Sequence, residues 1–146
     1  MNTTHQNDAQ TQIELFISCR KLKNKDTMSK SDPKVKAYLQ VGEDNNHTIL
    51  VGETEEIKDN LNPDFKTTIK VDYIFESKQV IKFTVFDEDG KGKEEHLGTV
   101  VTEVGKLVGA KDQVTTLDLD DKGKPGGKII IRVDNTNIEC NQFVQW

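Results

Sequence analysis

The fold of this chain is decided by the stretch VFDEDGKGKEEHLG, residues 85–98. It begins with a β-strand pattern, runs into an acidic loop that contains glycine, and then starts another strand. Asp87 and Asp89 alternate across the end of the first strand, so both carboxylates can lean the same way once the chain curls at Gly90. Glu95 returns from the far side of the loop, and three carboxylates then face one small volume.

These carboxylates would repel one another without a cation between them. A hard ion such as Ca²⁺, which takes about 6–8 oxygen ligands, resolves that repulsion. A second acidic pair, Asp26 and Asp32, precedes a different strand and can complete the site. An EF-hand loop does not fit, because counting from Asp87 places Lys91 at the fifth ligand position and Gly98 at the twelfth.

The composition limits the class of protein. The chain has 146 residues, enough for one ordinary domain, and a net charge of −5 at pH 7. The acidic balance argues against nucleic acid as a partner, which requires a basic surface. No apolar run is long enough to cross a bilayer, and the polar N-terminus lacks a signal core. Cys19 and Cys140 show no CxxC motif, so we expect two reduced thiols and a cytoplasmic protein.

Eight short segments alternate between apolar and polar residues, as half-buried strands do. They are residues 13–19, 35–41, 49–57, 65–71, 81–85, 97–101, 115–119 and 129–133. Only residues 103–110 are expected to hold a short helical turn. The pattern predicts an all-β fold, an eight-stranded antiparallel β-sandwich. We expect this domain to span 13–134, after a disordered tail at 1–12. Residues 135–146 are interpreted as a linker and the start of a following domain that has been cut off.

Two other interpretations of the acidic loops compete with a metal site. Acidic turns at strand ends are commonly solvated, but carboxylates from two separate loops exceed what solubility requires. Paired carboxylates also serve glycosidases as acid and base. Such sites use aromatic platforms, whereas aromatic residues make up only 6% of this chain and its sole tryptophan is Trp146. A GxSxG motif is absent, and Cys19 lies on a core-facing strand position, so we predict that the protein is not an enzyme.

Three short motifs resemble those of C2 domains. Leu22 and Asp26, followed by Ser-Asp-Pro at 31–33, are similar to the first calcium loop of that family. Asn-Pro-x-Phe at 62–65 is similar to its strand entry, and residues 85–98 to its third loop. Order and spacing agree across residues 13–134.

Finer features resemble one family in particular, the copines, in which two C2 domains precede a von Willebrand A-type domain. These features are KDTMSKSDP at 25–33, EEIKDNLNP at 55–63 and VDYIFE at 71–76. The resemblance implies that this chain is the first C2 domain, with the permuted (type II) strand connectivity. Its opening strand is then 13–19, and residues 129–133 form the strand that other members place first.

The resemblance also implies the ligands of the metal. The side-chain ligands would be Asp26, Asp32, Asp87, Asp89 and Glu95, the last at a position where aspartate is usual. Backbone carbonyls of Lys25 and Glu88 would add to them. At the loop tips, Met28 can insert into a bilayer, and Lys91 and Lys93 favour anionic headgroups, at about 1 kcal/mol each.

The function that follows is Ca²⁺-dependent binding of anionic phospholipid such as phosphatidylserine. Ca²⁺ would cancel the charge of the carboxylates, and the protein, a monomer, would move from the cytoplasm to the plasma membrane or other membranes. Downstream domains would bring protein partners. The alternative is a C2 domain that binds proteins without Ca²⁺. A basic sheet face with Lys34, Lys36, Lys66 and Lys70 is open to two interpretations, a phosphoinositide site or a solvated surface.

Overall fold

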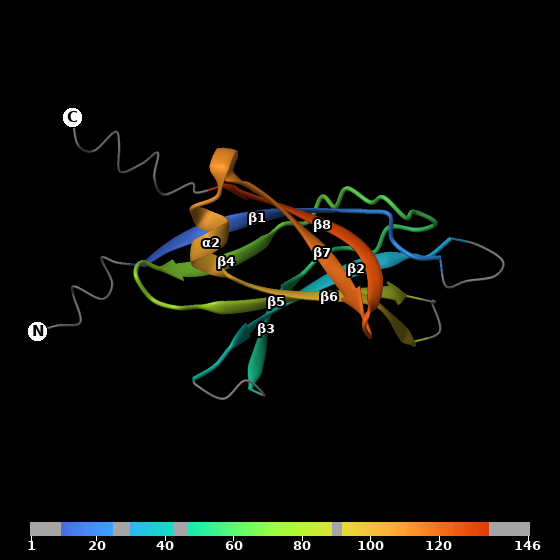
Figure 1. The fold of residues 1–146 in the computed structure, drawn as a ribbon, viewed down its shortest axis with the longest axis horizontal. Coiled ribbons are helices and arrows are strands. Elements are labelled where there is room, and N and C mark those ends of the chain that lie inside the picture. Colours follow the sequence, from blue (N-terminus) through green and yellow to red (C-terminus); the bar gives the residue numbers. More distant parts are fainter. Residues whose placement is uncertain (1–9, 25–29, 43–46, 89–91, 135–146) are drawn as a thin grey trace, which may run out of the picture.

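A computed structural model describes residues 10–24, 30–42, 47–88 and 92–134 of the chain. Among these residues, strands dominate and helices are short (Figure 1). The elements are β1 (Gln10–Arg20), β2 (Pro33–Gln40), β3 (Thr48–Glu53), β4 (Ile69–Ile74), β5 (Val80–Glu88), β6 (Glu94–Glu103), α2 (Val104–Val108), the 3₁₀ turn η1 (Lys111–Gln113), β7 (Val114–Asp121) and β8 (Lys124–Asp134). The all-β prediction and the predicted helical turn are confirmed.

All strand pairs are antiparallel, and the order across the sheet is β3-β2-β5-β6-β7-β8-β1-β4. The described part of β6 pairs with β7 at one position, Thr99 opposite Asp120. The sheet folds over at this junction, and β1 and β8 cross above β5 and β6 in Figure 1. The result is the predicted β-sandwich. β8 lies beside β1, and the permuted connectivity stays a prediction.

The core lies between the two layers and follows the alternation of the sequence. In β1, every second residue from Ile13 to Cys19 is buried, and the residues between them are partly exposed. β5 and β8 contribute Phe83 and Ile131, both fully buried. Each such aliphatic or aromatic side chain contributes about 1.5–3 kcal/mol when it leaves water. Among the described elements of this chain, none is a helix long and apolar enough to span a bilayer.

Three predicted strand limits are wrong. β1 begins at Gln10, inside the expected tail, because residues 10–12 pair with β4. β3 ends at Glu53, because Thr54 leaves the ladder: its N–H bonds to the Val35 carbonyl and its hydroxyl accepts the Val35 N–H. β4 runs from Ile69 to Ile74, whereas residues 63–65 lie against β1 through isolated hydrogen bonds. Isolated backbone bonds of this kind leave no periodic signal in the sequence.

One glycine lets two strand segments approach closely. A Cβ on Gly126 would lie 2.8 Å from the Leu97 carbonyl oxygen and 3.2 Å from that of Leu119. Both oxygens belong to the backbone of paired strands, so they cannot move away from an added methyl group as a flexible side chain could. A Cβ on Gly105, in α2, would meet nothing within 4 Å.

We therefore expect Gly126→Ala to lower the free energy of unfolding by about 1–3 kcal/mol through overpacking. The control, Gly105→Ala, removes the same residue type from open space and should be neutral or stabilising by up to about 1 kcal/mol. Urea unfolding of the two variants and the parent measures both effects. Equal stability of the two variants would contradict this account of the close approach.

Candidate functional site

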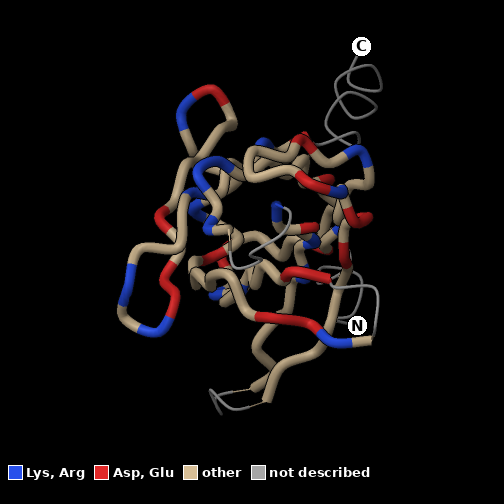
Figure 2. The backbone as a smooth tube through the Cα atoms, turned by 90° about the vertical axis from the view of Figure 1, so that its right-hand side faces the viewer, with Lys and Arg blue, Asp and Glu red and all other residues tan. Residues whose placement is uncertain are grey.

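Those predicted site residues that the structure describes lie at one end of the long axis of the molecule. β2 begins at this end, β5 finishes there and β6 returns from it, on the right-hand side of Figure 1. Figure 2 looks onto the same end and shows acidic and basic segments mixed around it. The antiparallel pairing of β2 with β5 places Pro33 opposite Asp87, so the segment before β2 meets the end of β5.

Hydrogen bonds join Asp32 to Asp87. The Asp32 N–H donates to Oδ1 of Asp87 at 2.8 Å, and the Glu88 N–H donates to the Asp32 carbonyl at 3.0 Å. The Asp87 side chain is only 1% exposed. A buried carboxylate needs hydrogen bonds or a cation to offset its lost hydration. The two aspartates, 55 residues apart in the chain, therefore lie in direct contact, as the acidic loops led us to expect.

A β-bulge brings the third described carboxylate to the same position. β5 and β6 pair Val85 with Gly98 but Phe86 with His96, which leaves Leu97 as the extra residue of the bulge. The shift sets Glu95, rather than His96, directly opposite Asp87. Opposed residues of an antiparallel pair point to the same face with Cβ atoms about 4.5–5.5 Å apart. Glu95 is exposed, so its carboxylate is open to an ion at the rim.

The next cross-strand pair is also acidic. Glu88 lies opposite Glu94, and Lys34 approaches Glu88 at 3.7 Å. A hydrogen bond with the Glu94 carboxyl raises the pKa of Glu88, with burial and repulsion adding to the effect. The hydrogen bond from Lys36 lowers the pKa of Glu94. The Glu88 side chain is thus engaged with its neighbours, while the role of its backbone carbonyl as a ligand stays a prediction.

Several predicted site residues lie outside the described residues, namely Lys25, Asp26, Met28, Asp89 and Lys91. Lys93 is described and is exposed just before β6. In the described ranges no group of three or more His, Cys, Asp or Glu side chains is close enough to hold a metal. The structure places Asp32 in contact with Asp87 and Glu95 opposite Asp87 in the ladder. Three members of the proposed ligand set, Lys25, Asp26 and Asp89, lie outside the described residues.

Two supporting contacts were missed by sequence reasoning. Ser31 is fully buried, and its hydroxyl donates to the Lys23 carbonyl at 2.9 Å, which joins the two ends of the first loop. The Asp59 N–H donates to Oδ1 of Asp32 at 2.8 Å. Asp59 has a left-handed φ of 52°. In the sequence this residue stood out only as part of the motif at 55–63, just before the turn expected at 60–63. Only its three-dimensional position reveals the contact.

Two of the four lysines of the basic sheet face are paired with glutamates. Lys34 pairs with Glu53 at 2.5 Å, and Lys36 pairs with Glu94 at 2.9 Å while lying over the Phe86 ring. Lys66 and Lys70 are exposed. Paired ammonium groups have less charge to offer an anionic ligand, so the structure favours the interpretation of a solvated face.

Comparison with known proteins agrees with this architecture. The sequence profile of the C2 domain family matches residues 13–119. The chain belongs to the C2 domain family. This C2 domain is 40% identical over 125 residues to Copine-E of Dictyostelium discoideum, a match that covers 83% of the chain. Copine-A of the same organism is 38% identical over 122 residues. The chain spans about a fifth of the length of these relatives, 22% and 20% respectively.

A solved structure shares the fold at appreciable identity. The first C2 domain (domain A) of plant extended synaptotagmin 1 superimposes with a TM-score of 0.67 at 26% identity, covering 86% of this chain and 95% of that one. The calcium-bound pair of C2 domains, A and B, of extended synaptotagmin 2 matches with a TM-score of 0.60 at 21% identity, over 86% of this C2 domain and 46% of that chain. At this identity, the second similarity shows a shared fold only.

The loop that supports Asp32 depends on a carboxylate, and this makes stability sensitive to pH. Glu55 accepts the backbone N–H groups of Lys66 and Thr67 at 2.8 and 3.0 Å. Burial raises the pKa of Glu55, but these hydrogen bonds outweigh it and the net shift is downward. The carboxylate therefore stabilises the fold above its unfolded pKa of about 4.3, and this contribution is lost as pH falls through the lower, folded value.

We expect Glu55→Gln to destabilise the domain by about 1 kcal/mol at pH 7, since a hydrogen-bonded charge is replaced by a neutral amide. The difference from the parent should shrink between about pH 5 and pH 3. Urea unfolding at several pH values measures it, with Glu76→Gln on an exposed turn as the charge-matched control. A difference that is constant with pH would contradict the assignment.

Proposed function

We propose that this C2 domain binds Ca²⁺ between the loops at 25–32 and 87–95 and thereby attaches to anionic phospholipid membranes. The single observation that carries the proposal is the meeting of Asp32 and Asp87, with Glu95 opposite Asp87 in the ladder. All three offer oxygen ligands, the kind that Ca²⁺ prefers. The Asp87 carboxylate is almost fully buried, and a bound cation would offset the cost of burying its negative charge.

The proposed ligand set combines described residues with the rest of both loops. It consists of the side chains of Asp26, Asp32, Asp87, Asp89 and Glu95 and the backbone carbonyls of Lys25 and Glu88. The hydrogen bonds of Asp32 hold the first loop against the third before any ion arrives, which reduces the ordering needed on binding. Bound Ca²⁺ would supply positive charge and coordination positions for phosphate oxygens.

Charge explains why membrane attachment would depend on the ion. Without it, clustered carboxylates repel an anionic headgroup surface, and bound Ca²⁺ reverses the local sign. Met28, Lys91 and Lys93 would then meet the bilayer, with phosphatidylserine-like lipid as the expected partner. Lys93 is exposed at the start of β6, which supports such a contact. The domain acts by binding and not by catalysis.

The place of the domain in a larger protein is also a proposal. The copine-like motifs and the similarity to Copine-E support a first C2 domain that spans 13–134, with residues 135–146 opening a second one. We infer a monomer in the cytoplasm that moves to the plasma membrane or other membranes when Ca²⁺ rises. Protein partners would bind through downstream domains, and nucleic acid is not an expected ligand.

One observation favours a second candidate, a C2 domain that binds proteins without Ca²⁺. Oδ1 of Asp32 and Oδ1 of Asp87 each accept a backbone N–H, a structural role that needs no ion. The proposed ligand set holds four aspartates and Glu95, more carboxylates than this structural role requires, and this supports the calcium proposal. The two candidates differ in the response of the isolated domain to Ca²⁺.

We expect vesicles that contain phosphatidylserine to sediment the domain with Ca²⁺ and not with a chelator. Asp87→Asn/Asp89→Asn should abolish this binding, because it removes two charged ligands while keeping the side-chain size. Asp72→Asn/Asp112→Asn is the matched control: it removes the same charge from exposed positions outside the site and should bind as the parent does. Binding that is equal with and without Ca²⁺ would contradict the proposal.

Ca²⁺ should also stabilise the fold in the absence of lipid. At a free concentration of about 100 Kd, a ligand bound only by the native state adds about 2.7 kcal/mol, which raises Tm by several degrees. Thermal unfolding monitored by circular dichroism measures this shift. The Asp87→Asn/Asp89→Asn variant should show none, and Mg²⁺ serves as a control for ionic strength. No shift of the parent at millimolar Ca²⁺ would favour the Ca²⁺-independent candidate.

A further inference from the structure

A histidine side chain connects β6 to β7 directly beside the proposed calcium site. Nδ1 of His96 lies 3.2 Å from Oδ1 of Asp121, the last residue of β7. Nε2 of the same ring lies 2.6 Å from the Thr99 hydroxyl, which in turn lies 3.2 Å from the hydroxyl of Thr84 in β5. Both ring nitrogens are therefore engaged. We call the contact between His96 and Asp121 the histidine link.

The histidine link lies where the two strands share little backbone pairing. Among the described residues, β6 and β7 pair at one position, Thr99 opposite Asp120. On its other side, β6 pairs with β5 along the whole range from Val80 to Glu88. The start of β6 is thus held by a backbone ladder on the β5 side, whereas on the β7 side it is held by the side chain of His96.

His96 stands between Glu95 and the extra residue of the bulge, Leu97. Its ring meets that of Phe86, the residue opposite it in β5, edge to face with centroids 6.3 Å apart. Neighbouring residues of a strand point to opposite faces, so a ring that is fixed on one face also fixes the direction of Glu95. A slip of one residue in this pairing would remove Glu95 from its place opposite Asp87.

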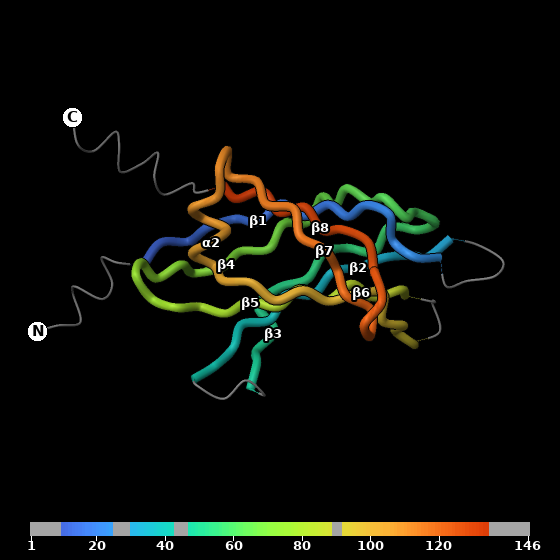
Figure 3. The backbone as a smooth tube through the Cα atoms, in the orientation of Figure 1, coloured from blue at the N-terminus to red at the C-terminus, as the bar shows by residue number. Residues whose placement is uncertain are grey.

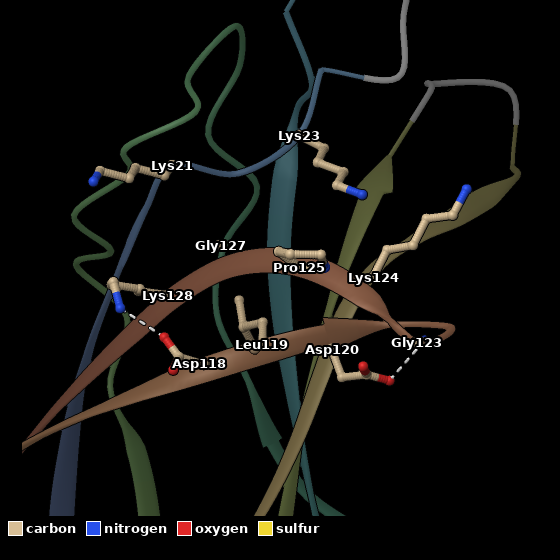
Figure 4. Close-up of a pocket in the computed structure, with 10 residues that line it drawn as sticks. All are labelled: Lys21, Lys23, Asp118, Leu119, Asp120, Gly123, Lys124, Pro125, Gly127 and Lys128. Carbon is tan, nitrogen blue, oxygen red and sulfur yellow. Dashed lines mark hydrogen bonds and ion pairs between the residues drawn. The ribbon is translucent and has the colours of Figure 1, made fainter.

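The partner of the histidine lies on a well-defined hairpin. β7 and β8 are joined by Lys122 and Gly123, whose φ values of 52° and 88° are both positive, as a type I′ turn requires. Oδ2 of Asp120 accepts the Gly123 N–H at 3.2 Å, which closes this turn (Figure 4). Asp121 itself is buried. The link therefore ties the start of β6 to a fixed point.

Asp121 is also connected to the first loop. Figure 3 shows the tip of the β7–β8 hairpin at the same end of the long axis as the start of β6. Nζ of Lys23 lies 4.0 Å from Oδ2 of Asp121, and the Lys23 carbonyl accepts the Ser31 hydroxyl at 2.9 Å, directly before Asp32. Asp121 thus contacts the strand that carries Glu95 on one side and the segment that leads to Asp32 on the other.

We propose that His96 and Asp121 are positioning residues for the calcium site. Their contact keeps Glu95 opposite Asp87 and thereby sets the affinity for Ca²⁺, although neither side chain is in the proposed ligand set. The inference rests on the proposed function, in which Glu95 is a ligand. Ligands that are held in place before the ion arrives lose less freedom on binding. Removal of residues that orient metal ligands typically weakens metal binding by about 10–100-fold.

The test compares two substitutions of the histidine. His96→Leu removes both polar contacts, whereas the amide of His96→Gln can donate to Asp121 and accept from Thr99. Isothermal titration calorimetry of the 146-residue chain with Ca²⁺, without lipid, measures the affinity. His96→Leu should bind about tenfold or more weakly, and His96→Gln should recover most of the loss. His47→Leu, at an exposed histidine before β3, is the matched control and should bind as the parent does. Equal affinity of His96→Leu and the parent would overturn the proposal.

Two further variants separate positioning from a general loss of stability. Ile131→Val removes a methyl group from the buried core and lowers stability away from the site, so its Ca²⁺ affinity should equal that of the parent. Asp121→Ala should weaken Ca²⁺ binding as His96→Leu does. The double variant should lose little more than either single one, because both changes break the same contact. Additive losses, or an equal loss in Ile131→Val, would overturn the assignment.

A measurement without the ion examines the geometry directly. In NMR spectra of the Ca²⁺-free domain, the parent and His96→Gln should show cross-strand contacts between Asp87 and Glu95. His96→Leu should lose them while keeping those between Lys82 and Val101, further along the same ladder. Their retention in His96→Leu would overturn the inference alone. A parent that binds no Ca²⁺ in the calorimeter would overturn the proposed function, and the inference with it.

Discussion

The hydrogen bond from the Asp32 N–H to the Asp87 carboxylate is the contact on which the site depends. It joins the segment before β2 to the end of β5, two strands of one ladder whose core residues are fully buried. Because Asp87 is almost inaccessible to solvent, its charge must be offset by donors or by a cation. The fold thus supports a carboxylate that is costly to bury, and this is a common property of binding sites.

The β-bulge at Leu97 shows how one extra residue in a strand changes which side chain lies opposite Asp87. An unbroken ladder would place His96 opposite Asp87, whereas the extra residue brings Glu95 there. The same shift lets His96 contact Asp121 at 3.2 Å and Thr99 at 2.6 Å, so it links β6 to the end of β7. Bulges are frequent beside functional sites because they redirect side chains without disturbing the rest of the sheet.

Ion pairs offset lysine charge on two surfaces of the domain. On the sheet face, Lys34 and Lys36 are neutralised by glutamates from neighbouring strands. Beside the β7–β8 hairpin, Lys128 pairs with Asp118 at 2.6 Å and Lys23 lies 4.0 Å from Asp121. The Ser31 hydroxyl donates to the Lys23 carbonyl, and the Lys23 ammonium lies near Asp121, so the segment before Asp32 is linked to the end of β7. A net charge of −5 conceals this local pattern.

The sequence by itself determined the all-β class, the core faces of the strands and the two acidic loops. Alternation in β1 and β5 reports burial directly, because side chains of a strand point to opposite faces in turn. Only the tertiary structure decided the early end of β3, the late start of β4, the bulge at Leu97 and the contact between Asp59 and Asp32. These features arise from hydrogen bonds and close contacts between segments distant in the chain, and local periodicity carries no record of such partners.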